Sequence, residues 1–137
     1  MMTSTTTKKY TLDSTIDSLA KVEHIIESLK EEHSIPEEIY GNILVSMSEG
    51  MNNAVKHGNK FDSKKEVEFS FELGEKEYQF TIIDQGPGFD HNNVPDPTHP
   101  DNLEKLDGRG IFIMESLADK IDYEEEGSKV ILTFNRV

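Results

Sequence analysis

The stretch that most constrains this chain runs from residue 36 to residue 57, because it predicts one long amphipathic helix. Its apolar residues recur at helical spacing on one broad face, which comprises Ile39, Ile43, Leu44, Met47, Met51, Ala54 and Val55. A narrower polar stripe comprises Asn42, Ser46, Glu49 and Asn53. Glu49, Asn53 and His57 follow one another at intervals of four residues, so they stack along the helix. We expect the apolar face to lie in the core and the polar stripe to look outward.

Start and stop signals bound this predicted helix on both sides. Ser34 and Glu37 have the spacing of a capping box, and Pro36 suits the first turn of a helix. Gly58 follows directly after His57, and glycine commonly ends helices. The signals therefore predict a helix that begins near Pro36 and ends before Gly58.

The rest of the chain alternates between strand and helix patterns. Residues 66–73 and 78–82 alternate apolar and polar side chains across a turn, which predicts a hairpin with one wet face. Other patterns predict a strand at 8–12, a first helix from Asp13 or Ser14, and a final strand at 130–134. A third helix is predicted directly after Gly110. Its apolar series includes Ile121, although a strand start at 121–123 is the alternative for that residue. We therefore expect an α+β fold, a two-layer sandwich with a mixed, mainly antiparallel sheet that helices cover on one face.

Length and composition limit what the chain can do. Its 137 residues suffice for a single core, so we expect residues 1–137 to form one domain with a disordered leader at 1–7. No apolar run approaches the ~20 residues that cross a bilayer, and the polar start lacks the centre of a signal peptide, so we expect a cytoplasmic protein without membrane contact. The absence of cysteine excludes disulfides and thiolate catalysis.

The formal charge of -13 arises from 27 acidic and 14 basic residues and argues against direct binding to nucleic acid. Solubility and the docking of a partner both explain such a balance. Any anionic ligand must be held by local backbone dipoles, a divalent cation and a few basic side chains, because the mean field of the chain repels it.

Two glycine-containing motifs follow the long helix. Asp84-Gln85-Gly86-Pro87-Gly88 comes after the second strand of the hairpin, and Gly108-Arg109-Gly110 precedes the third predicted helix. The glycines of the first motif allow close backbone approach and positive φ, although a plain turn explains this motif as well. Glycines before a helix expose N–H groups at the positive end of the helix dipole, where phosphate binds, although a surface ion pair also explains Arg109.

The order and spacing of these motifs resemble the nucleotide-binding boxes of the GHKL ATPase and kinase superfamily. The resemblance covers roughly residues 36–134 and rests on Glu49-x-x-x-Asn53-Ala54-x-x-His57, then Asp84-x-Gly86-x-Gly88, then Gly108-x-Gly110. It implies the Bergerat-type ATP-binding fold, with ATP and Mg²⁺ as cofactors. It also implies that residues 89–107, which contain three prolines and show no period, are a mobile nucleotide lid.

The resemblance implies a role for each matching residue. Asn53 offers a carboxamide oxygen to Mg²⁺ beside the phosphate oxygens, and Glu49, one helical turn earlier, is the general base. Asp84 accepts a hydrogen bond from the adenine amino group, and Gly86 and Gly88 let the backbone pass close to the base.

The remaining matches are Gly108, Arg109 and Gly110 at the phosphates. Ser128 occupies the position where the family often has a threonine near the nucleotide, although serine after glycine is common in turns. His57 matches as well, but helix capping explains it, so we assign it no catalytic role.

Within the superfamily, the chain looks most like the bacterial anti-sigma factor serine/threonine-protein kinases, because its size and the run from Gly108 to Asp119 match them. Those proteins bind ATP, sequester a sigma factor and phosphorylate a small antagonist protein, and they often form homodimers. The alternative is a binding module that holds ATP or ADP as a switch and docks a partner without phosphotransfer. Glu49 favours the kinase, because a module that only binds has no need of a base.

Overall fold

The computed structural model describes residues 6–86, 106–125 and 128–136 of the chain. Five strands form one sheet in the order β1-β2-β3-β5-β4, and every pair of neighbours among these described strands is antiparallel. The strands are β1 (Thr6–Asp13), β2 (Glu66–Leu73), β3 (Glu77–Ile83), β4 (Lys120–Glu124) and β5 (Lys129–Asn135).

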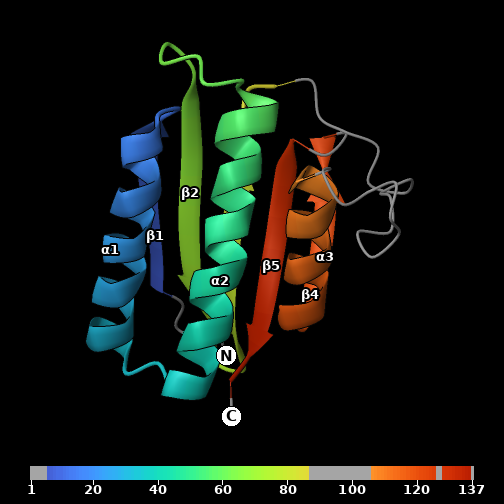
Figure 1. Ribbon diagram of the computed structural model, residues 1–137. Helices are drawn as coiled ribbons and strands as arrows, with labels where there is room; N and C mark the ends of the chain where they lie inside the picture. The colour runs from blue at the N-terminus through green and yellow to red at the C-terminus, as the bar shows by residue number, and fades with distance from the viewer. Residues whose placement is uncertain (1–5, 87–105, 126–127, 137) are drawn as a thin grey trace.

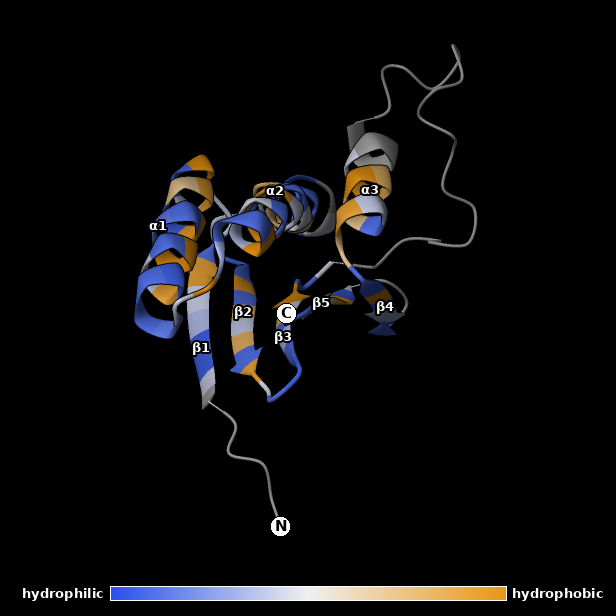
Figure 2. Ribbon diagram, turned by 90° about the horizontal axis from the view of Figure 1, so that it is seen from below, coloured by the Kyte–Doolittle hydropathy of each residue, from blue (hydrophilic) through white to orange (hydrophobic). Residues whose placement is uncertain are grey.

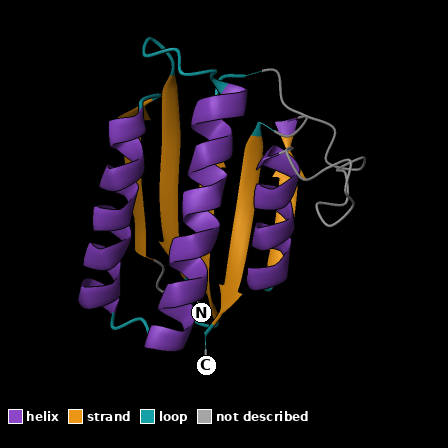
Figure 3. Ribbon diagram, viewed as in Figure 1, coloured by secondary structure: helices purple, strands orange, loops and turns teal. Residues whose placement is uncertain are grey.

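Helices cover one face of this sheet, with α2 between α1 and α3 (Figures 1 and 3). Seen along the strands, the helices form one layer and the sheet the other (Figure 2). The helices are α1 (Ile16–His33), α2 (Glu37–Asn53), the short π-helix η1 (Ala54–Gly58) that continues α2, and α3 (Leu106–Leu117). The predicted α+β sandwich with helices on one face is confirmed, although no parallel pair occurs among the described strands.

Aromatic side chains from neighbouring strands form the centre of the core. The ring of Phe80 on β3 lies 5.0 Å from that of Phe71 and 6.1 Å from that of Phe69, both on β2. On its other side, the Phe80 ring lies 6.0 Å from that of Phe134 on β5, edge to face. The alternation of buried and more exposed residues along β2 and β3 produces this one-sided core.

The predicted apolar face of α2 packs on these rings. Ile43, Met47, Met51 and Val55 are fully buried, and Ala54 is nearly so. Together with the apolar face of α1, they seal the helical layer against the sheet. None of the described helices is both long enough and apolar enough to cross a membrane.

The predicted capping box of the second helix and the predicted start of the first helix are wrong, whereas the second helix does begin near Pro36. Ser34 does not cap α2; it ends α1 in the left-handed conformation with φ 54°, and its N–H binds the carbonyl of Lys30. The N-cap of α2 is Pro36, which makes no side-chain capping bond. The first helix begins at Ile16 instead of Asp13 or Ser14, because β1 runs through Asp13.

The third helix differs from its prediction at both ends. It begins at Leu106, before Gly110, and it ends at Leu117. Ile121 belongs to β4, as the alternative strand start at 121–123 predicts.

Candidate functional site

The last two turns of α2 carry Glu49 and Asn53, and α3 lies directly against them. A Cβ added to Gly110 would lie 2.8 Å from Glu49 Oε2, 3.4 Å from Asn53 Nδ2 and 3.5 Å from Asn53 Oδ1. The absence of a side chain at Gly110 therefore lets α3 approach the carboxylate and the carboxamide. Glu49, Asn53 and Gly110, which belong to two of the three predicted boxes, are neighbours in space.

This contact corrects the prediction that the polar stripe of α2 looks outward. Ser46 of that stripe is fully buried, and Glu49 and Asn53 are only half-exposed beneath α3. The C-terminal part of the stripe, at Glu49 and Asn53, instead lies against α3, whereas Asn42 at the other end is exposed as predicted. A polar face on an amphipathic helix usually meets solvent, so composition alone could not reveal that α3 packs against these polar side chains.

The Gly108-Arg109-Gly110 motif lies inside α3 and does not precede it, which corrects a second prediction. Gly108 is in the first turn of α3, where backbone N–H groups have no acceptor within the helix. The N–H groups that the prediction assigns to phosphate therefore belong to the first turn of α3 and not to a loop before it. The side chain of Arg109 lies outside the described residues.

Asp84 directly follows β3, at the end of the sheet where α2 and η1 also end (Figure 1). Its N–H donates to the carbonyl of Ser128 at 2.9 Å, and its Oδ1 accepts the N–H of Gly86 at 2.8 Å. Among the described residues, no hydrogen bond reaches Oδ2. Burial raises the pKa of the Asp84 carboxyl, while the Gly86 N–H and the charge of Lys65 oppose that shift.

Two glycine backbones meet beside Asp84. A Cβ on Gly86 would lie 2.1 Å from the carbonyl oxygen of Gly58, and a Cβ on Gly58 would lie 2.4 Å from Asp84 Cγ. Gly86 does not adopt a positive φ, so that part of its prediction is wrong. The described close contact of Gly86 is with the Gly58 backbone at the end of η1, and the predicted approach to the base stays a prediction.

Gly58 and Asn59 are site residues that the sequence analysis missed. Gly58 ends η1 against the Asp84 carboxylate. Asn59 is fully buried, and its Oδ1 accepts the N–H of Gln85 at 2.7 Å. A glycine after a helix is most simply explained as a stop signal, so only the spatial contact with Asp84 identifies these two residues.

Three predicted assignments remain outside this geometry or have a plain explanation within it. Gly88 and residues 89–105 of the predicted lid lie outside the described residues, and residues 106 and 107 belong to α3. The side chain of His57 also lies outside them. Ser128 is beside Asp84 through its carbonyl, but its hydroxyl donates to the carbonyl of Glu125 at 2.9 Å within the turn.

The donor set near Gly110 fits Mg²⁺. The carboxamide oxygen of Asn53 is a hard oxygen ligand, and it lies where no side chain of residue 110 intervenes. No cluster of three or more His, Cys, Asp or Glu side chains able to hold a metal occurs in the described parts of the chain. A cation here would consequently need ligands from a bound molecule as well, as Mg²⁺ commonly has when it accompanies phosphates.

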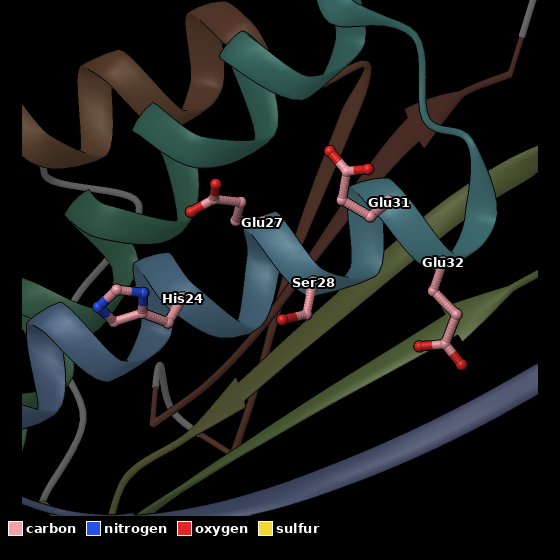
Figure 4. A pocket seen from close by; sticks show the side chains of 5 residues that line it. All are labelled: His24, Glu27, Ser28, Glu31 and Glu32. Carbon is pink, nitrogen blue, oxygen red and sulfur yellow. The ribbon is translucent and has the colours of Figure 1, made fainter.

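A shallow hollow lies elsewhere, on the outer surface of α1. Its lining residues all come from that helix and spread along it without converging on one point (Figure 4). They are His24, Glu27, Ser28, Glu31 and Glu32. Within the described part of the chain, no group from a second element is among these lining residues.

Comparison with known proteins identifies the family of the chain. A family model described as a histidine kinase-like ATPase domain matches residues 12–134. Serine-protein kinase RsbW from Staphylococcus aureus, strains MSSA476 and MW2, is 32% identical to this chain over 97 residues. The alignment covers 65% of this chain and 61% of each relative, so the chain spans less than two thirds of their length.

A solved structure shares the fold. The crystal structure of the RsbU and RsbW domains of Rv1364c from Mycobacterium tuberculosis superposes with a TM-score of 0.64 at 21% sequence identity. The match covers 96% of this chain and 33% of that one. At that identity, the likeness establishes the arrangement of helices and strands only.

Proposed function

We propose, because this chain belongs to the histidine kinase-like ATPase domain family, that it binds ATP with Mg²⁺ and transfers the γ-phosphate to a serine or threonine of a small partner protein. The observation that carries the proposal is the convergence of Glu49, Asn53 and Gly110, with the Asp84 turn at the same end of the sheet. Kinases named RsbW are its relatives at 32% identity, which supports the same reaction class.

The adenine base is the proposed ligand of Asp84. Oδ1 is held by the Gly86 N–H, and Oδ2 has no hydrogen bond within the described part of the chain, so it can accept the exocyclic amino group. Partial burial strengthens that bond relative to a solvated carboxylate. Gly86, Gly88 and Ser128 complete the adenine end of the proposed site.

The phosphates belong, in this proposal, between α2 and the first turn of α3. Backbone N–H groups in the first turn of α3, near Gly108, and the charge of Arg109 would attract them, and Asn53 would offer its carboxamide oxygen to the accompanying Mg²⁺. The cation supplies charge neutralisation for the triphosphate. This local arrangement offsets the repulsion expected from a chain with a net charge of -13.

Glu49 has the proposed role of general base. Its carboxylate lies against Gly110, one helical turn before Asn53, and so beside the expected γ-phosphate. It takes the proton of the acceptor hydroxyl while that oxygen forms a bond to the γ-phosphorus and the bond to ADP breaks. The products are ADP and a phosphoserine or phosphothreonine.

The proposed partners are a sigma factor and an antagonist protein that receives the phosphate. The anti-sigma role rests on the likeness to the RsbW kinases, whose matched stretch is only part of their length. The competing proposal is a nucleotide-gated binding module. The half-exposed Glu49 beside Asn53 favours the kinase, because nucleotide binding alone does not require a base.

Replacement of Glu49 by Gln tests the kinase directly. The variant keeps the shape of the side chain but cannot take a proton, so we expect phosphotransfer to fall by about a hundredfold to ten-thousandfold while ATP affinity stays within about twofold. The measurement is transfer of labelled γ-phosphate to a small antagonist-type protein, with calorimetric ATP binding of the wild-type and Glu49→Gln proteins.

The wild-type protein supplies the control. If it binds ATP and its partner but transfers no phosphate over hours, the binding module replaces the kinase. A Glu49→Gln protein that transfers at the wild-type rate would remove Glu49 from the mechanism.

A further inference from the structure

Asn59 connects three segments that are far apart in the chain. It is fully buried, and its Nδ2 donates to Ser14 Oγ at 2.7 Å and to the carbonyl of Glu66 at 3.1 Å. Its Oδ1 accepts the N–H of Gln85 at 2.7 Å. One carboxamide therefore joins the start of α1, the start of β2 and the turn that carries Asp84.

The turn itself is held on several sides. Gln85 Oε1 accepts the N–H of Glu66 at 2.8 Å, so Gln85 is bound through both its backbone and its side chain. The neighbouring Asp84 N–H donates to the carbonyl of Ser128 at 2.9 Å. Within this set, the Gln85 N–H donates the hydrogen bond that joins the turn after β3 to Asn59, which directly follows η1.

The chemistry at this position requires a carboxamide. The surroundings need two donors, for Ser14 and Glu66, and one acceptor, for the Gln85 N–H. Asparagine supplies both donors and the acceptor, whereas serine has one donor and aspartate has none when ionised. A buried group left without its partner is costly, so substitution disturbs the turn as well as the network.

We propose that Asn59 is a positioning residue that sets the place of the Asp84 carboxylate and thereby the selectivity of the site for adenine. The proposal rests on the proposed nucleotide-binding function. Its basis is adjacency: the N–H that Asn59 holds belongs to the residue after Asp84, and the next residue, Gly86, is packed against the backbone of Gly58. The Asn59 backbone N–H also binds the carbonyl of Ala54 at 2.8 Å, so the same residue fixes the end of η1.

A positioning role and a purely structural role differ in what they do to base selectivity. Guanine carries a carbonyl where adenine carries its amino group, so a fixed carboxylate accepts a hydrogen bond from adenine and repels guanine. ADP and GDP have identical phosphates. A general loss of stability thus leaves the ratio of their affinities unchanged, whereas a displaced Asp84 lowers that ratio.

The test compares Asn59→Ala with Ser14→Ala. Ser14→Ala removes one hydrogen bond from the Asn59 amide and one to the carbonyl of Lys65, but it leaves the bond to the Gln85 N–H intact. We expect the ratio of ADP to GDP affinity to fall about tenfold in Asn59→Ala and to keep its wild-type value in Ser14→Ala. Calorimetric titration, with GDP measured by competition against ADP, gives the ratio, and thermal melts report the loss of stability in each variant.

A second variant covers the case in which Asn59→Ala does not fold. Gln85 is exposed, and Gln85→Ala removes the other anchor of the same turn, so we expect its ADP to GDP ratio to fall in the same direction, by about threefold. A wild-type ratio in Gln85→Ala, or in a folded Asn59→Ala, overturns the positioning role. If the wild-type protein binds neither ATP nor ADP, the proposed function fails and this inference fails with it. If the wild type binds ADP but the variants keep its ratio of ADP to GDP affinity, only this inference fails.

Discussion

Replacement of Gly110 by alanine separates the stability of α3 from the chemistry of the site. Gly110 is a buried residue of α3, and a Cβ there would lie 2.8 Å from Glu49 Oε2. That oxygen is the tip of a flexible side chain, so the carboxylate gives way and the helix keeps its place. The two contacts with Asn53, at 3.4 and 3.5 Å, stay close to ordinary packing distances.

Two contributions of opposite sign act on the free energy of unfolding, and a separate effect acts on the rate. Alanine is favoured over glycine inside a helix by about 1 kcal/mol, and a strained Glu49 rotamer costs about 0.5 to 1.5 kcal/mol. We therefore expect the free energy of unfolding to change by no more than about 1 kcal/mol. The carboxylate moves by roughly half an ångström to restore an ordinary contact, which corresponds to a loss of roughly tenfold in phosphotransfer.

The assay combines urea denaturation with labelled phosphate transfer, and Gly41→Ala is the matched control. Gly41 is an exposed residue of α2, and a Cβ there would have no neighbour within 4 Å. We expect Gly41→Ala to gain roughly 0.5 to 1 kcal/mol of stability at an unchanged rate. If Gly110→Ala transfers phosphate at the wild-type rate, the catalytic role of Glu49 is refuted. If the variant loses several kcal/mol of free energy of unfolding, the claim that only the tip of the Glu49 side chain moves is refuted.

Two further substitutions test the two ends of the site. Burial raises the pKa of Asp84 above its ordinary value of 3.8, so neutral Asp84 favours the fold at low pH and this contribution is lost as pH rises through the raised pKa. In thermal melts at pH 7, Asp84→Asn should then be at least as stable as the wild type, and the wild type should gain stability relative to the variant toward pH 4. The affinity of the variant for ADP should fall at pH 7. A clear loss of stability in the variant at pH 7 would contradict the desolvation argument. Asn53→Ala should weaken ATP binding in the presence of Mg²⁺ by about tenfold and barely affect ADP binding without Mg²⁺; equal losses in the two titrations would exclude a metal role for Asn53.

The sheet and the core could be predicted from the sequence because their signal is periodic and local. Strand β2 occupies the predicted residues 66–73, and β3 extends the predicted 78–82 by one residue at each end. Alternation identifies which side chains turn inward, so Phe69, Phe71 and Phe80 are buried as expected. Each of these predictions depends on neighbours within a few residues of one another.

The parts that failed depend on contacts between distant segments. The stripe of Ser46, Glu49 and Asn53 has the composition of a wet helix face, but α3 packs on it because Gly110 removes the obstructing side chain. Gly108 and Gly110 are poor helix formers, so propensity favours a loop where the structure has the start of α3. Packing of α3 against α2 is a tertiary effect that no local pattern reveals.

The end of α2 shows how a local departure from helical geometry serves the site. The predicted helix continues to His57, but from Ala54 the chain follows a π-helix, and the N–H of Phe61 reaches back to the carbonyl of Val55. A π-helix has a wider turn than an α-helix, so the backbone after Asn53 leaves the i, i+4 register of α2. The wider turn ends with the Gly58 backbone against Asp84, while Asn53 still faces Gly110. Because the helical register changes between Asn53 and Gly58, α2 and η1 together contact both ends of the proposed site, at Gly110 and at Asp84.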